Sequence, residues 1–85
     1  MEFNELMTDS ILIVKTDGRT FQIDHAIVNG RTITFDDASV PVEEGDIVEH
    51  KLPNGLVQRF RVLDHGYRAA FDDFLAGYDM KVRRL

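Results

Sequence analysis

The sequence predicts a mainly β protein: a small barrel or two-layer β-sandwich of about six antiparallel strands, with one short helix before the last strand. Three observations support this class. Short runs of alternating apolar and polar residues recur along the chain. Turn-forming pairs or triplets separate several of them, at residues 17–18, 29–30 and 53–55. The length of 85 residues fits one domain with one core.

The first three strands are expected over residues 10–15, 20–28 and 31–35. Asp17-Gly18 is typical of a type I′ hairpin turn, which needs positive φ at both central residues. In the second strand Phe21, Ile23 and Ile27 share one face by alternation. His25 falls on that face too, unless a β-bulge rotates it away. The three strands therefore form a meander.

The middle of the chain predicts a second hairpin, between residues 47–52 and 56–63. It is preceded by a short extended piece at residues 40–42, which Pro41 confines to an edge or a crossover. In the returning strand Phe60 and Val62 alternate with arginines, so the apolar pair is expected inside and the arginines outside.

The helix is expected over residues 67–76, because Phe71, Phe74 and Leu75 follow helical spacing and Gly77 suits a C-cap. Residues 78–83 alternate again and form a final strand that closes the sheet.

The start of the chain, residues 1–8, is expected to form a short helix or a mobile arm. Its apolar side chains share one side of such a helix and make a candidate terminal anchor: Phe3, Leu6 and Met7.

The composition and the lengths of the apolar runs predict in which compartment the protein works and which kinds of site it lacks. No cysteine is present, which excludes disulfides and thiolate–zinc sites. The longest apolar run, residues 11–14, is far too short to cross a bilayer, and the acidic start differs from a secretory leader. We therefore expect a soluble protein of the cytoplasm with no membrane partner.

Charge is distributed unevenly along the chain. Residues 1–50 hold eleven acids and three bases, a net charge of −8, whereas residues 51–85 hold four acids and seven bases, a net of +3. This is either an ordinary solvated surface or two faces of opposite sign. The candidate acidic interaction face is Asp36, Asp37, Glu43 and Glu44, and the candidate basic interaction face is Arg59, Arg61, Lys81, Arg83 and Arg84.

No pattern of catalytic or ligand-binding residues is visible. His25, His50 and His65 have separations that match no metal-ligand motif. The glycines lie singly, so none forms a phosphate-binding loop. We expect a non-enzyme with no catalytic residues, metal, cofactor or small-molecule substrate.

Several segments together resemble a family of small β-rich domains from bacterial and prophage proteins. They are Pro41, Gly45-Asp46-Ile47-Val48, Leu52-Pro53-Asn54-Gly55 and the strand end Val62-Leu63-Asp64-His65-Gly66-Tyr67, with residues 78–83 as the closing strand. The resemblance covers about half of the chain. Its layout is also similar, at the level of architecture, to head-tail joining proteins of tailed phages. It implies a place in the host cytoplasm or the virion and no catalytic residue.

These observations favour a non-enzymatic protein–protein interaction module, in particular a phage-type structural adaptor that packs with copies of itself in a ring. Residues 1–8 and 82–85 would be its ordering arms. One alternative is an acidic inhibitor that mimics nucleic acid and acts on a host protein. A further alternative is a small nucleic-acid-binding barrel, against which the overall acidity argues.

Overall fold

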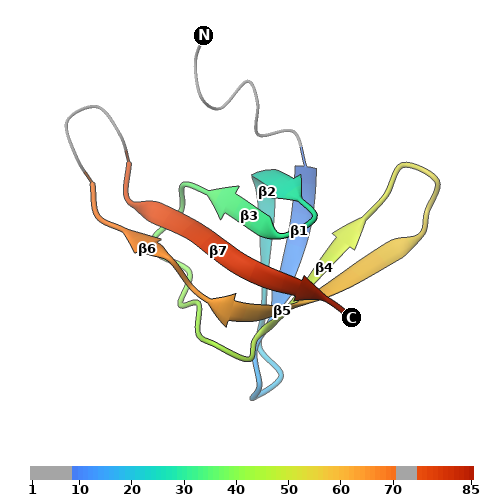
Figure 1. Cartoon of the computed structure of the whole chain (residues 1–85), viewed down its shortest axis with the longest axis horizontal. Coiled ribbons are helices and arrows are strands. Elements are labelled where there is room, and N and C mark those ends of the chain that lie inside the picture. Colours follow the sequence, from blue (N-terminus) through green and yellow to red (C-terminus); the bar gives the residue numbers. More distant parts are fainter. Residues whose placement is uncertain (1–8, 71–74) are drawn as a thin grey trace, which may run out of the picture.

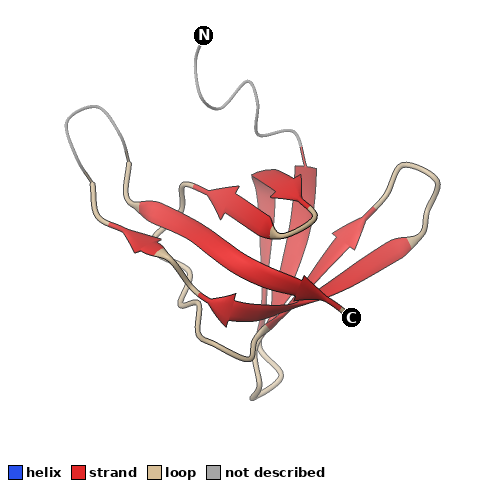
Figure 2. Ribbon diagram, viewed as in Figure 1, coloured by secondary structure: helices blue, strands red, loops and turns tan. Residues whose placement is uncertain are grey.

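The computed structural model describes residues 9–70 and 75–85, and these residues contain seven strands and no helix (Figure 2). The strands are β1 (Asp9–Val14), β2 (Thr20–Asn29), β3 (Thr32–Phe35), β4 (Ile47–Lys51), β5 (Val57–Asp64), β6 (Tyr67–Arg68) and β7 (Gly77–Arg84).

Six of these strands close into an antiparallel barrel (Figure 1). The order is β3-β2-β1-β4-β5-β7, and a direct pairing between β3 and β7 closes the circle. The short strand β6 pairs only with the beginning of β7. Closure gives each of the six strands a partner on both sides, which removes the exposed edges that promote aggregation. The predicted mainly β fold is thus confirmed, as a barrel with one extra strand.

The core of the barrel consists of the apolar side chains that point inward from the strands. The side chains of Phe35 and Phe60 are 0% and 1% exposed, and isoleucines and valines from the other strands surround them. The loop between β3 and β4 also contributes, since Val40 and Val42 on either side of the exposed Pro41 are buried. Because β3 and β4 are not neighbours in the sheet, this loop is a crossover, one of the two alternatives predicted for Pro41.

A β-bulge in β2 changes which of its side chains point inward. Asp9 pairs with Ala26 and Ile11 pairs with Ile23, so three steps along β2 match two along β1. The extra residue shifts the alternation, so that Ala26 is buried and His25 is exposed. The prediction that Ile27 lies inward with Ile23 is therefore wrong, and the bulge that would turn His25 outward is present.

Two hairpins use the same kind of turn. Backbone hydrogen bonds between Lys15 and Arg19 and between Leu52 and Leu56 each close a three-residue loop. Each loop ends on a glycine with positive φ, 92° at Gly18 and 88° at Gly55. The turns lie where the sequence predicted them, but the first is a three-residue loop rather than a two-residue type I′ turn.

The helix predicted over residues 67–76 is not found in the described part of this segment. Tyr67 and Arg68 instead form β6, because their backbones pair with β7 at Tyr78 and Gly77. Gly77 is therefore the first residue of a strand and not a helix cap. Phe71 and Phe74 lie outside the described residues, as do residues 1–8 with the expected short helix or arm. Within residues 9–70 and 75–85 there is no helix of the length and apolar character that would cross a bilayer.

Barrel closure depends on the absence of a side chain at Gly77. A methyl group there would overlap the backbone carbonyl of Phe35 on β3, whereas one at Gly30 would meet no atom within 4 Å. We expect Gly77→Ala to lower the free energy of unfolding by about 1–3 kcal/mol through overpacking, and Gly30→Ala to change it by less than about 0.5 kcal/mol. Urea denaturation of both variants measures this. Equal stabilities would contradict the close approach of β7 to β3.

Candidate functional site

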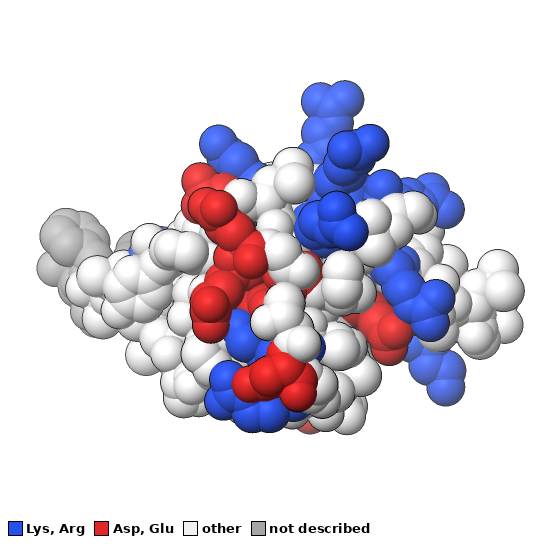
Figure 3. Space-filling view, turned by 90° about the horizontal axis from the view of Figure 1, so that it is seen from below, with Lys and Arg blue, Asp and Glu red and all other residues white. Residues whose placement is uncertain are grey.

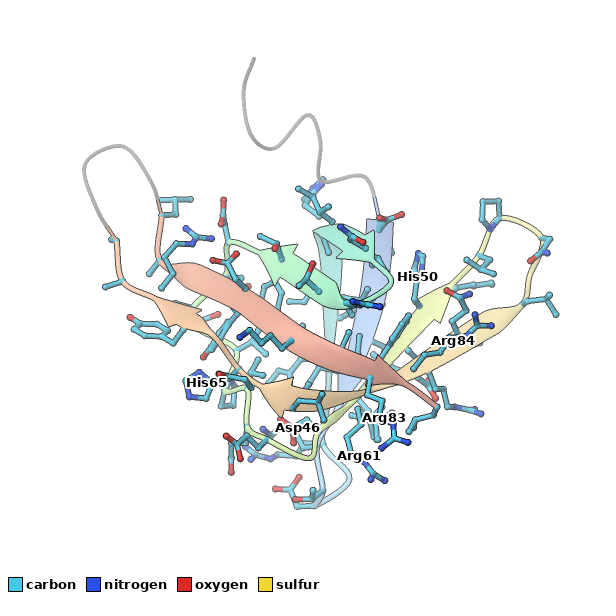
Figure 4. All side chains as sticks on the ribbon, viewed as in Figure 1. Asp46, His50, Arg61, His65, Arg83 and Arg84 are labelled. Carbon is cyan, nitrogen blue, oxygen red and sulfur yellow. The ribbon has the colours of Figure 1, made fainter. Side chains whose placement is uncertain are left out.

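Strands β5 and β7 place a pair of arginines directly opposite each other on the outside of the barrel. Arg61 pairs in register with Arg83, next to the buried pair Val62–Val82 (Figure 4). Both arginines are exposed. Lys81 lies two residues before Arg83 on the same outward face of β7, as alternation requires. The pairing of β5 with β7, on which the expected arrangement of these cations depends, is present.

The other two predicted members of the basic group lie differently. Arg59 binds Glu49 of β4, with its Nε 2.9 Å from a carboxylate oxygen, so its charge is locally balanced. Arg84 is opposite the buried Phe60, which gives it the inward parity at the end of the barrel. Figure 4 shows Arg84 on the other side of the β7 ribbon from Arg83.

Arg31 joins the group instead. It lies in the β2–β3 turn, and its carbonyl accepts a hydrogen bond of 2.9 Å from the amide of Val82. Sequence reasoning missed it because the β3–β7 pairing that brings it there is the closing contact of the barrel. We call Arg31, Arg61, Lys81 and Arg83 the basic face.

The side chains of the basic face form no ion pair with residues 9–70 or 75–85, and Lys81 lies opposite Asp64 in the β5–β7 pairing. No carboxylate of residues 9–70 or 75–85 lies within 4.0 Å of a charged nitrogen of these four side chains. A shallow depression of about 540 Å³ lies beside them, lined by residues 30–32, Leu63 and residues 81–84. Three of the four cations of the basic face, Arg31, Lys81 and Arg83, border this depression, and Arg61 lies next to Arg83 outside it.

Leu63 adds an apolar group to this surface. Val62 pairs with Val82 and Asp64 pairs with Lys81, so Leu63 is the extra residue of a bulge in β5. Its side chain remains 50% exposed. The bulge therefore places a large aliphatic side chain beside the arginines, and this side chain is not part of the core.

The predicted acidic face divides into two parts. Asp36 binds Arg68 at 2.7 Å, and this hydrogen bond raises the pKa of the Arg68 guanidinium. Asp37 accepts hydrogen bonds from the amide and hydroxyl of Ser39 within its own loop. These two carboxylates hold the β3–β4 loop. Glu43 and Glu44, which we call the acidic turn, are exposed.

The acidic turn is held by a buried ion pair that the sequence did not reveal. Lys15 and Asp46 are 4% and 1% exposed, and Lys15 Nζ lies 2.5 Å from Asp46 Oδ2. The same ammonium donates to the carbonyl of Pro41 at 2.7 Å and lies 3.4 Å from a carboxylate oxygen of Glu43. Asp46 Oδ2 also accepts from the Glu43 amide at 2.8 Å. A lysine at the end of an apolar strand gave no signal of this role.

The remaining titratable groups do not converge. His50 is buried with its Nε2 3.4 Å from Asp9, His65 accepts a hydrogen bond from the Tyr67 amide, and His25 is exposed at the β2 bulge. Among the described residues no group of three or more His, Cys, Asp or Glu side chains is placed to hold a metal ion.

The two predicted arms have different outcomes. Phe3, Leu6 and Met7, the candidate anchor, lie outside the described residues. Residues 82–85 are not an arm: Val82 to Arg84 belong to β7, and the Leu85 amide donates to the carbonyl of Arg59 at 2.9 Å. This segment pairs with β5, and the hydrogen bonds of that pairing fix its backbone.

Comparison with protein-family models, with curated proteins and with solved structures found no match for this chain.

Proposed function

We propose that this chain is a non-enzymatic protein–protein interaction module that binds its partner through the basic face. The observation that carries the proposal is the Arg61–Arg83 pair. Like charges directly opposite each other on one face of a sheet destabilise the sheet by up to about 1 kcal/mol. The fold gains nothing from this pair within the described residues. An acidic partner would convert the same pair into a favourable contact.

The neighbours of the arginines favour a protein as the partner over a nucleic acid. The half-exposed Leu63 and the backbone of the β2–β3 turn border the basic face, and none of the described residues that line its depression is aromatic. Single-stranded nucleic acids are bound by stacking on aromatic rings, and duplexes by an excess of positive charge. The net charge of this chain is −5. A polypeptide with acidic and aliphatic side chains fits the surface better.

The more specific form of the proposal is a structural adaptor of the phage head-tail joining type. It rests on the resemblance described above, and the closed barrel is a suitable rigid body for such a role. The acidic-mimic alternative has less support, because two of its four carboxylates hold their own loop.

The binding proposal is tested with a fluorescent peptide of mixed glutamate and leucine and an oligonucleotide of equal charge. At physiological salt the peptide should bind, and an Arg61→Gln/Arg83→Gln variant should bind it about tenfold or more weakly. Arg59→Gln is the matched control, because Arg59 is already paired with Glu49. Tighter binding of the oligonucleotide than of the peptide would favour the nucleic-acid-binding barrel instead.

The same pair makes a prediction about stability. Arg83→Gln removes a like-charge contact and should leave the free energy of unfolding unchanged or raise it by about 0.2–1 kcal/mol. Arg59→Gln removes an exposed ion pair and should lower it by up to about 1 kcal/mol. Urea denaturation at low salt measures both. A loss of stability in Arg83→Gln would mean that the arginine serves the fold.

A further inference from the structure

The acidic turn lies beside the basic face of the same molecule. The amide of Gly45, which follows the turn, donates to the carbonyl of Val62 at 2.8 Å, and the Val62 amide donates back to the carbonyl of Asp46 at 2.9 Å. Arg61 and Leu63 are the neighbours of Val62 in β5. Figure 3 shows acidic and basic side chains gathered in neighbouring areas of one face of the molecule.

Neighbouring patches of opposite sign around an apolar group make a surface complementary to itself. A two-fold axis near Leu63 would bring the acidic turn of one copy to Arg61 and Arg83 of the other, and the reverse contact would form at the same time. The two leucines would meet near the axis, beside the depression that Leu63 lines.

We propose that this surface binds a second copy of the chain in a two-fold symmetric dimer, with Leu63 near the axis and each acidic turn on the partner's basic face. This rests on the proposed function and names its partner. Both halves of the contact are pre-ordered. The basic face is carried by paired strands, and the acidic turn is fixed by Asp46 and the buried Lys15. Ordering of the backbone would therefore oppose association little.

Two of the carboxylates beside this surface already have partners within the chain. Glu43 is 3.4 Å from the Lys15 ammonium, so Glu44 is the carboxylate of the turn without an ion-pair partner in the described chain. Asp64, opposite Lys81, accepts a hydrogen bond from the Gly66 amide. Glu44 and Arg61 are thus the best positions at which to reverse a charge.

The test is a charge exchange followed by sedimentation velocity at low salt. Wild-type protein should form dimers that dissociate as salt is raised. Glu44→Lys alone and Arg61→Glu alone should each weaken dimerisation about tenfold or more, because each contact then opposes like charges. An equimolar mixture of the two variants should recover a dimer, since both of its contacts pair opposite charges.

Lys51→Glu is the matched control for Arg61→Glu. It makes the same change in net charge at an exposed β4 position near the hairpin loop, and it should dimerise like wild type. Arg61→Gln removes the charge of Arg61 without reversing it. Circular dichroism of every variant separates loss of the dimer contact from loss of folding.

Several results would overturn the dimer. They are a wild-type monomer at every concentration, a mixture that stays monomeric, an equal effect of Lys51→Glu, or species that grow beyond two copies, which would indicate head-to-tail packing. If the monomer still binds the glutamate–leucine peptide through Arg61 and Arg83, the dimer is wrong and the proposed function stands. If the chain neither dimerises nor binds the peptide, the dimer and the proposed function are both wrong.

Discussion

Replacing Lys15 with methionine should lower the free energy of unfolding by about 3–5 kcal/mol, because it leaves the carboxylate of Asp46 buried without its counter-charge. A chain of 85 residues has a total of only about 4–13 kcal/mol. The variant should therefore lose a large share of its total stability. Chemical denaturation followed by circular dichroism, with a stabilising osmolyte if needed, measures the loss.

The double variant Lys15→Met/Asp46→Leu separates the ion pair from packing. Removing both charges should recover most of the stability, since a buried ion pair replaced by apolar groups is often neutral or stabilising. Lys51→Met, at an exposed position, should change the free energy of unfolding by less than about 0.5 kcal/mol. If Lys15→Met is equally mild, the ion pair does not hold the β3–β4 loop.

Truncating Phe35 to alanine should lower the free energy of unfolding by about 3–5 kcal/mol, from lost apolar burial and the cavity left behind. Phe35 is 0% exposed, lies opposite both Ala26 and Tyr78, and has its ring centroid 5.3 Å from that of Tyr78. It therefore fills the barrel where β3 meets β7.

Phe35→Leu is the conservative control and should cost less than half as much as the alanine change, because more of the volume is retained. Leu56→Ala, at a side chain that is 63% exposed in the β4–β5 hairpin, should cost about 0.5 kcal/mol or less. Urea melts of the three variants give the comparison. Similar costs for Phe35 and Leu56 would contradict a core built around the β3–β7 closure.

The sequence predicted the strands well where alternation was undisturbed. In β7, and in β5 before its bulge, the apolar residues Phe60, Val62, Tyr78, Met80 and Val82 are all buried, so the pattern also placed Arg61 and Arg83 outside. It failed in β2, since the bulge opposite β1 moves Ala26 inward and Ile27 out of that position. A bulge depends on the partner strand, which a local pattern does not contain. The same holds at the described start of the segment expected to be helical, where Tyr67 and Arg68 are held by pairing with β7.

The candidate site was predictable only in part. Strand parity brings Arg61, Lys81 and Arg83 to one surface, but it says nothing of Arg31, which arrives through barrel closure. Strand parity also does not show which charged side chains already have an ion-pair partner in the same chain. In the sequence nothing distinguishes Arg59 and Asp36 from unpaired charges. In the structure Arg59 pairs with Glu49, and Asp36 pairs with Arg68. Long-range pairing, and not composition, decides which charges are left for another molecule.

We propose that this protein meets other polypeptides through the outer face of β5 and β7 and not through the remainder of its surface. Amide NMR spectra of labelled protein, recorded on dilution and again with the glutamate–leucine peptide, test it residue by residue. We predict that the resonances that move are those of Arg61, Leu63, Lys81 and Arg83, with the β1–β2 turn unaffected. Shifts confined to residues 24–37, or no shifts under either condition, would contradict it.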